Sequence, residues 1–142
     1  VLFDGSNTAE FILVSSPPNE TPLIRTIAMP ADANPNGDIF GGWLMAQMDL
    51  AGGAHAFAAA GGRVATVAVD AMTFHRPVQV GDQVSCYCST VKIGTTSIAV
   101  KVDTWVRRRH DWTEERVTEG VFTFVALDDS GRPRPVEGDG PD

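Results

Sequence analysis

The sequence is poor in several features that mark particular classes of protein. Only two of its 142 residues are cysteine and three are histidine, so we expect neither a disulfide framework nor a zinc site. Acidic residues outnumber basic ones and give a formal net charge of −7, which argues against binding to nucleic acid because such binding needs a basic surface. No uninterrupted apolar run is long enough to cross a bilayer. We therefore expect one soluble domain, and a cytoplasmic location because no signal peptide opens the chain.

The two cysteines do not suggest a bond or a metal site. Cys86 and Cys88 lie two residues apart in a segment typical of a β-strand, which points both thiols to the same face and makes a disulfide between them unlikely. A metal site that combined them with His75 or His110 would lack any known ligand spacing. We expect free thiols, no metal ion and no cofactor.

Turn residues and prolines divide the chain into three parts. We expect an N-terminal arm over residues 1–21, one domain over residues 22–127, and a flexible tail rich in glycine, proline and aspartate over residues 128–142. The domain should contain one helix, from near Gly41 to Ala60, and five strands. The expected strands are residues 23–29, 64–75, 83–93, 95–108 and 116–127.

This order of elements predicts an α+β fold. A sheet that buries so apolar a helix should be antiparallel and curl around it. One sheet covers only one side of the helix, and its edge strands stay unpaired. A dimer or a larger oligomer is therefore expected.

The stretch from Asn34 to Gly62 carries the clearest functional signal. It begins as a loop of turn-forming residues, in which Gly41 and Gly42 permit a ligand or another backbone to come close. The helix that follows has few strongly polar side chains: Gln47, Asp49 and His55. A carboxylate on a buried helix is rarely tolerated unless it is paired, hydrogen-bonded or used in chemistry.

Two glycines accompany this carboxylate. Gly52 and Gly53 share the helix face of Asp49, which predicts that another backbone or a slender ligand passes close to it. The alternative is a helix–helix crossing at the glycines, with Asp49 satisfied by a neighbouring amide.

The chain resembles the YciA type of hotdog-fold acyl-CoA thioesterases in four segments: TIAMPADANPNGDIFGGWLMAQMDLAGG, VAVDAMTFHRPVQVGD, KIGTTSI and FVALDDSGRPR. The resemblance spans residues 23–134. It implies a hotdog fold, cytoplasmic hydrolysis of acyl-CoA to free fatty acid and CoA, a role in fatty acid metabolism, no cofactor, and a homohexamer built as a trimer of dimers. The carboxylate that ends the family's LMxxMD motif is catalytic and corresponds to Asp49. Asp38 occupies a loop position where related thioesterases often carry asparagine.

A mechanism can be proposed from the residues themselves. Backbone amides at the helix start, at Gly41 and Gly42, are natural donors to a thioester oxygen that becomes negative in the transition state. Asp49 lies about 12 Å further along the helix at 1.5 Å per residue, too far to act on the same carbonyl carbon. We expect composite sites, in which one chain supplies the helix start and its partner supplies Asp49.

The roles of the two aspartates stay open at this point. Asp49 acts either as a general base on water or as a nucleophile. Asp38 either caps the helix or closes the loop, or else positions the substrate.

The phosphates of coenzyme A call for basic groups and amides at a pocket mouth. The substrate-binding candidates in the sequence are Asn34, Gly41, His75, Arg76, Lys92, Gly94, Thr95, Thr96, Ser97, Arg107 and Arg108. Each basic residue among them is also explained as a solvated surface charge, and the Gly-Thr-Thr-Ser run as an ordinary hairpin turn.

Other functions are supported less well. A catalytic triad using Ser97 lacks the sharp strand-to-helix turn that such a nucleophile needs, and His55 is expected to be a core or interface histidine. The main alternative is a non-catalytic acyl-CoA binding or sensing protein with the same fold, which would not need Asp49. A purely structural oligomer leaves both aspartates unexplained.

Overall fold

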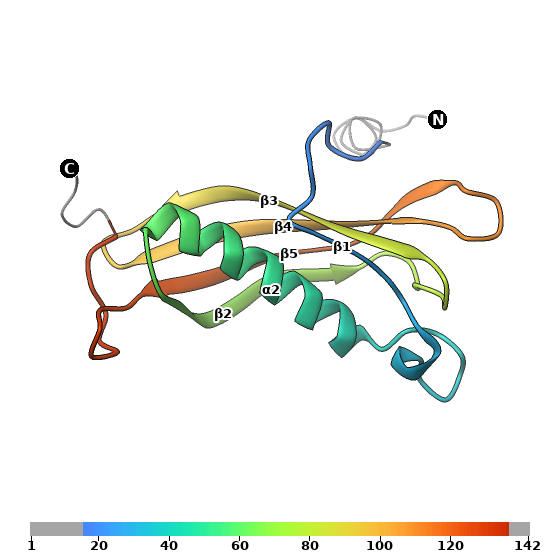
Figure 1. Cartoon of the computed structure of the whole chain (residues 1–142), viewed down its shortest axis with the longest axis horizontal. Helices are drawn as coiled ribbons and strands as arrows, with labels where there is room; N and C mark the ends of the chain where they lie inside the picture. The colour runs from blue at the N-terminus through green and yellow to red at the C-terminus, as the bar shows by residue number, and fades with distance from the viewer. Residues whose placement is uncertain (1–15, 137–142) are drawn as a thin grey trace.

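The computed structural model describes residues 16–136. The first 15 residues of the expected arm and the end of the expected tail, from residue 137, lie outside the described residues. The described part contains the following elements: β1 (Ile24–Ile27), the 3₁₀ turn η1 (Pro30–Asp32), α2 (Gly41–Ala60), β2 (Val64–Phe74), β3 (Gln83–Ile93), β4 (Ser97–Arg107) and β5 (Glu114–Ala126) (Figure 1).

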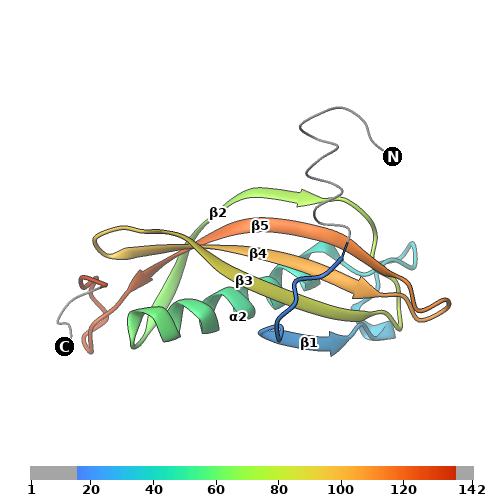
Figure 2. The same cartoon turned by 90° about the horizontal axis from the view of Figure 1, so that it is seen from above.

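The strands form one antiparallel sheet in the order β1-β3-β4-β5-β2, and α2 lies across one face of it (Figures 1 and 2). The sequence predicted an antiparallel sheet packed on one helix and the bounds of β3, and the structure adds the order of the strands. The start of α2 lies at the same end of the molecule as the β4–β5 hairpin, whereas its last turn lies near the β3–β4 hairpin (Figure 2). Two strands, β1 and β2, form the edges of the sheet.

Helix α2 is built from residues that favour helix and lose little side-chain entropy in it, mainly alanine, leucine and methionine. It ends where Gly61 adopts a left-handed conformation, with φ of 71°, and donates its N–H to the carbonyl of Phe57 at 2.9 Å. Glycine is the residue that adopts this conformation without strain. The chain can therefore reverse directly into β2.

One face of α2 is closely packed against the sheet. Met48, Gly52 and Ala56 are buried there. A Cβ added at Gly52 would lie 3.1 Å from ring carbons of Phe124 and 3.4 Å from Val102. The close approach predicted at this glycine is therefore made by an aromatic ring of the chain's own sheet, and not by another backbone.

The opposite face of α2 is uncovered. The side chains of Leu50 and Phe57 are 62% and 56% exposed, although both are apolar. The sequence correctly indicated a helix that is apolar nearly all round, but one sheet encloses only one side of it. Residues 16–136 do not supply the second cover that the sequence predicts for this face.

The central strands follow the predicted alternation. Ile98, Val100 and Val102 of β4 point toward the helix and are fully buried. Trp105 lies on the other face of the strand and is only 4% exposed, so this part of the outer face is buried as well. The expected strand 95–108 is trimmed to Ser97–Arg107 because the residues before it form a tight turn.

Both cysteines are free and buried on the helix side of β3. Burial raises the pKa of the Cys86 thiol to about 11. Burial, together with nearby acidic charges and Cys86, raises the pKa of Cys88 to about 12. Both groups therefore remain neutral thiols at physiological pH, as core residues and not as nucleophiles.

Residues 128–136 contact the domain, although their composition is typical of a loop. Arg134 donates from Nη2 to the carbonyl of Ala60 at 2.8 Å, at the last turn of α2, where a cation is favourable. Val136 is 8% exposed and joins the main core, and its N–H donates to the carbonyl of Thr95 at 2.8 Å. No helix in the part of the chain described here is long and apolar enough to span a membrane.

Candidate active site

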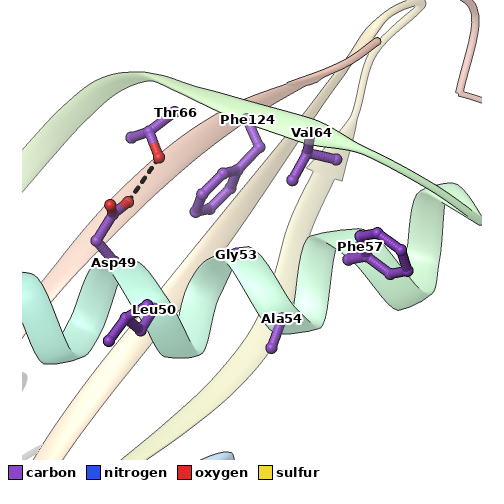
Figure 3. Close-up of a pocket in the computed structure, with 8 residues that line it drawn as sticks. All are labelled: Asp49, Leu50, Gly53, Ala54, Phe57, Val64, Thr66 and Phe124. Carbon is purple, nitrogen blue, oxygen red and sulfur yellow. Dashed lines mark hydrogen bonds between the residues drawn. The ribbon is translucent and has the colours of Figure 1, made fainter. Parts of the chain in front are cut away.

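Asp49 is half-buried and faces β2 from the middle of α2. The hydroxyl of Thr66 donates a hydrogen bond of 2.6 Å to its Oδ1 (Figure 3). Within residues 16–136 this is the one side-chain or backbone hydrogen bond made to the carboxylate. The second carboxylate oxygen, Oδ2, is thus available to a water molecule or a substrate.

Thr66 is the site residue that sequence reasoning missed. It pairs with Phe124 of β5, just before a register shift in β2 that separates it from Ala68. Side chains alternate along a strand, so Thr66 is on the same, helix-facing side as Val64. This alternation is the sequence signal that could have identified Thr66. A second shift between Asp70 and Thr73 obscures the period of β2 as a whole.

A pocket of about 490 Å³ opens beside Asp49. It is lined by Asp49, Leu50, Gly53, Ala54, Phe57, Val64, Thr66 and Phe124 (Figure 3). Asp49 and Thr66 lie toward one end and supply its polar side chains, whereas Phe57 lies toward the other end. A pocket with one polar end and apolar walls fits a substrate that has a reactive polar group and an apolar chain.

The start of α2 offers unpaired backbone amides. The first N–H groups of a helix have no partner inside the helix, and Phe40 at the N-cap supplies no side-chain bond. Gly42 is exposed, and a Cβ there would meet no atom within 4 Å. This end of the helix is therefore open to an incoming carbonyl oxygen or to another chain.

The loop before α2 is organised by Asn34. Its side-chain Oδ1 accepts hydrogen bonds from the N–H groups of Asn36 at 2.9 Å and Asp38 at 3.1 Å, and Gly37 takes a φ of +92° to complete the turn. Asp38 does not cap the helix, because the N-cap is Phe40. The Asp38 backbone closes the loop, and its side chain makes no hydrogen bond among the described residues.

The basic candidates near the start of α2 are already paired with acids. Arg108, 6% exposed, binds Asp82 at 2.6 Å, the carbonyl of Pro77 at 3.0 Å and Glu115 at 3.0 Å. Burial alone would lower the pKa of Arg108. The hydrogen bonds to Glu115 and Asp82 raise it by more, so the net pKa lies above the usual value and the guanidinium stays charged. Its Nε and Nη1 donors are used inside the protein, which argues against Arg108 as a phosphate ligand.

The other three basic candidates at this end are more exposed. Their partners are Glu115 for Arg76 at 3.1 Å, Glu119 for His75 at 2.8 Å, and Glu114 for Arg107 at 2.8 Å. Arg107 also stacks on Trp112, 4.7 Å from the ring centroid. A phosphate would have to compete with a carboxylate at each of them.

The remaining candidates lie at the opposite end of the molecule. Lys92 and the run from Gly94 to Ser97 belong to the β3–β4 hairpin, near the last turns of α2 (Figure 2). His55 is hydrogen-bonded there to Thr90 at 2.8 Å, as a satisfied histidine would be. Within one chain, then, the predicted site residues form two groups with Asp49 between them.

Among residues 16–136 no three potential ligands gather in a way that would hold a metal ion.

Comparison with known proteins identifies the family. The sequence profile of the thioesterase superfamily matches residues 36–112. The acyl-CoA thioester hydrolase YciA of Salmonella typhimurium is 52% identical over 117 residues, which cover 80% of this chain and 88% of that protein. The chain belongs to the thioesterase superfamily. The predicted YciA-type hotdog thioesterase, and with it a hydrolase, is confirmed at the level of the family.

Solved structures support the assignment of the chain to this superfamily. The hexameric thioesterase of Yersinia pestis is 53% identical with a TM-score of 0.78, and the match covers 83% of this chain and 96% of that one. An acyl-CoA hydrolase from Staphylococcus aureus, solved with butyryl coenzyme A and coenzyme A, is 30% identical with a TM-score of 0.73, covering 79% and 68%. Mutants of that enzyme carry alanine at an asparagine and at an aspartate 15 residues later. Asn34 and Asp49 have the same spacing.

Proposed function

We propose that this thioesterase hydrolyses acyl-CoA to a free fatty acid and coenzyme A, with Asp49 as its catalytic carboxylate. The observation that carries the proposal is the half-buried carboxylate of Asp49, held through one oxygen by Thr66 at the polar end of an apolar pocket. An acyl-CoA sensor of the same fold would need the pocket but not a carboxylate with a free oxygen. We therefore favour the enzyme.

The chemistry asks little of the protein. A thioester carbonyl is weakly stabilised by resonance and the CoA thiolate is a good leaving group, so a placed nucleophile and an oxyanion site suffice. As a general base, Asp49 takes a proton from water while the water oxygen attacks the carbonyl carbon; the tetrahedral intermediate then expels the thiolate as the carbon–sulfur bond breaks. As a nucleophile, Asp49 attacks the carbon itself, the carbon–sulfur bond breaks and the CoA thiolate leaves, and the resulting anhydride is later hydrolysed by water. Incorporation of ¹⁸O from solvent into the enzyme during a single turnover distinguishes the second route.

The oxyanion donors are proposed to come from a second chain. The amides of Gly41 and Gly42 are about 12 Å from Asp49 along one helix, whereas the substrate carbonyl must contact both groups at once. The uncovered apolar face of α2 and the unpaired edge strand β2 support a partner chain on this side. We propose antiparallel helices in a dimer with two composite sites, assembled further into a trimer of dimers.

Coenzyme A is proposed to contact the hairpin as well as the loop. Lys92 is the basic candidate with no ion pair among the described residues, and the amides and hydroxyls of Gly94 to Ser97 lie beside it. Asn34, His75, Arg76 and Arg107 stay proposed substrate contacts, the last three only where coenzyme A displaces their carboxylate partners. The proposed location is the cytoplasm, and the proposed role is in fatty acid metabolism.

The first experiment measures thiol release from a series of acyl-CoAs by the wild type and Asp49→Asn. The substitution keeps the shape and removes the base, so kcat should fall by about 10²–10⁴-fold while the oligomer persists. Asp70→Asn, an exposed aspartate on β2 outside the pocket, is the matched control and should keep its rate. Wild type that binds acyl-CoA without turnover would favour the sensor, and an active Asp49→Asn would move the search for the base to Asp38.

A second experiment tests the composite site. Gly42→Pro removes one candidate amide donor, and proline is tolerated in the first turn of a helix. Mixing this inactive variant with inactive Asp49→Ala should restore part of the activity, because a hybrid dimer contains one intact site. No recovery despite proven subunit exchange would count against sites shared between chains.

A further inference from the structure

The buried ion pair between Arg108 and Asp82 does not line the pocket beside Asp49, yet it is directed at backbone atoms. Arg108 donates from Nη1 to Asp82 Oδ2 at 2.6 Å and to the carbonyl of Pro77 at 3.0 Å. The same Oδ2 accepts the N–H of Gln79 at 2.9 Å, and the N–H of Asp82 donates to the carbonyl of Gln79 at 3.0 Å. The pair therefore fixes residues 77–82, which we call the β2–β3 turn.

The β2–β3 turn supports the loop that leads into α2. The N–H of Ile39 in this loop donates to the carbonyl of Val78 at 2.9 Å, and Asp38 pairs with Gln79 in an isolated antiparallel bridge. The side chains of Ile39, Val78 and Leu44 are buried in one core cluster, and Leu44 belongs to the first turn of α2. The loop and the helix start thus rest on the turn through both backbone and apolar contacts.

An ion pair directs this turn in a way that apolar side chains would not. An apolar pair of the same volume could fill the space with similar stability, but it could not bind the carbonyl of Pro77 or the N–H of Gln79. Hydrogen bonds constrain distance and angle. The proposed oxyanion donors, the amides of Gly41 and Gly42, directly follow the supported loop, and a misplacement of about 1 Å at a reaction site costs about 10²-fold in rate.

We propose that Arg108 and Asp82 are positioning residues, which act through the β2–β3 turn to fix the loop before α2 and, with it, the amides of Gly41 and Gly42. This inference rests on the proposed thioesterase function and adds two residues that serve the oxyanion donors without touching the substrate. Loss of the pair should lower kcat and leave KM close to the wild-type value, because it weakens an interaction made mainly in the transition state.

The test uses two matched double variants. Asp82→Leu with Arg108→Met, called the turn variant, removes the pair without leaving a buried charge unpaired. The control is Asp103→Leu with Arg116→Met, because Arg116 of β5 donates to Asp103 of β4 at 2.6 Å and, within residues 16–136, makes no hydrogen bond to the turn or to the loop. Circular dichroism and light scattering establish the temperature at which both variants are folded oligomers.

Steady-state kinetics at that temperature give the first result. The turn variant should lose about 10–10²-fold in kcat at nearly constant KM, and the control should keep both values. Arg108→Lys keeps the charge but loses the planar fork that reaches Pro77 and Asp82 together, so its kcat should fall less than that of the turn variant. A turn variant with the kcat of the control overturns the inference.

Mixing experiments place the defect within the composite site. The turn variant still supplies Asp49, so hybrid dimers with Asp49→Ala should regain activity. Hybrid dimers with Gly42→Pro should regain none, because both chains then have a defective helix start. Recovery with Gly42→Pro overturns the inference, and so does failure with Asp49→Ala under conditions in which Asp49→Ala and Gly42→Pro complement each other.

Hydrogen exchange followed by mass spectrometry tests the positioning role without catalysis. The amides of residues 34–44 should exchange faster in the turn variant than in the wild type or the control, while the central strands keep their protection. Faster exchange throughout the domain, or an unchanged loop, overturns the inference and leaves the thioesterase proposal standing. Wild type without any turnover of acyl-CoA refutes the proposed function, and the exchange measurement then decides the role of the ion pair alone.

Discussion

Two buried or half-buried aspartates, Asp82 and Asp49, show how differently this protein uses the same side chain. Asp82 is 1% exposed and receives bonds from Arg108 at 2.6 Å, the N–H of Gln79 at 2.9 Å and the N–H of Arg109 at 3.4 Å. Asp49 receives one bond, from Thr66, and faces a pocket. A carboxylate whose two oxygens are both hydrogen-bonded holds elements together, whereas one with a free oxygen beside a cavity is available for reaction. Substitutions at the two aspartates, compared by their effects on stability and on activity, test this contrast.

The largest expected effect on stability is at Asp82. Asp82→Ala leaves the buried guanidinium of Arg108 without its closest partner and should lower the free energy of unfolding by about 3–5 kcal/mol. Asp49→Ala should change the free energy of unfolding by less than about 1 kcal/mol, because it removes only one hydrogen bond, from the neutral hydroxyl of Thr66. Urea denaturation at one fixed protein concentration measures both, because association would otherwise shift the midpoints.

The assignment of these roles has its own control. Replacing both Asp82 and Arg108 by apolar residues of similar size should recover part of the loss, because no buried charge remains unpaired. If Asp49→Ala were as destabilising as Asp82→Ala, both aspartates would be structural and the comparison would fail.

The adjacent glycines of α2 repeat the contrast on a smaller scale. Gly52→Ala places a Cβ 3.1 Å from Phe124 and should destabilise the protein by about 1–2 kcal/mol, since overpacking outweighs the gain in helix propensity. Gly53→Ala meets the ring at 3.6 Å and should leave stability unchanged or raise it by up to about 1 kcal/mol. Thermal unfolding of the pair under identical conditions gives the difference, and equal melting temperatures would show that the two faces are not distinct.

Thr66 sharpens the comparison at the reactive carboxylate. Thr66→Val keeps the shape and removes the donor to Asp49, so kcat should fall by about tenfold, the equivalent of one hydrogen bond of about 1.4 kcal/mol. KM and the melting temperature should stay close to the wild-type values. Thr66→Ser should restore most of the rate, and a serine variant as slow as the valine variant would mean that the hydroxyl does not orient Asp49.

The smallest expected effect concerns Glu119, an intermediate case on the outer face of the sheet. Burial raises its pKa, but the hydrogen bond from His75 and the charges of Arg116 and Lys101 lower it more, so the net pKa lies below the usual 4.5. A lowered pKa in the folded state contributes stability above the unfolded pKa, and this contribution is lost as the pH falls through the folded value. Glu119→Gln should therefore flatten the decline in stability below about pH 4.5, measured by urea denaturation from neutral to acid pH. An equally steep decline in the variant would contradict it.

Local sequence patterns were enough to predict the elements and to single out the Asp49 carboxylate. The long helix, its end at glycine and the alternating strands follow from propensity and periodicity, which act over a few residues. Asp49 stood out because a carboxylate in an apolar helix is costly. Thr66 was missed because it joins Asp49 only through the pairing of β2 with β5, and this pairing depends on bulges that disturb the strand's period.

The sequence by itself determined the α+β class, the apolar helix and the carboxylate at its centre, because these depend on the order and hydrophobicity of neighbouring residues. Only the tertiary structure decided which charges are free. Arg108 is an ordinary surface arginine by its sequence neighbours but is enclosed by Asp82 and Glu115, and Val136, in a segment of loop composition, completes the core. Ion pairs and core contacts join residues that are distant in sequence, so they exist only once the sheet has brought those residues together.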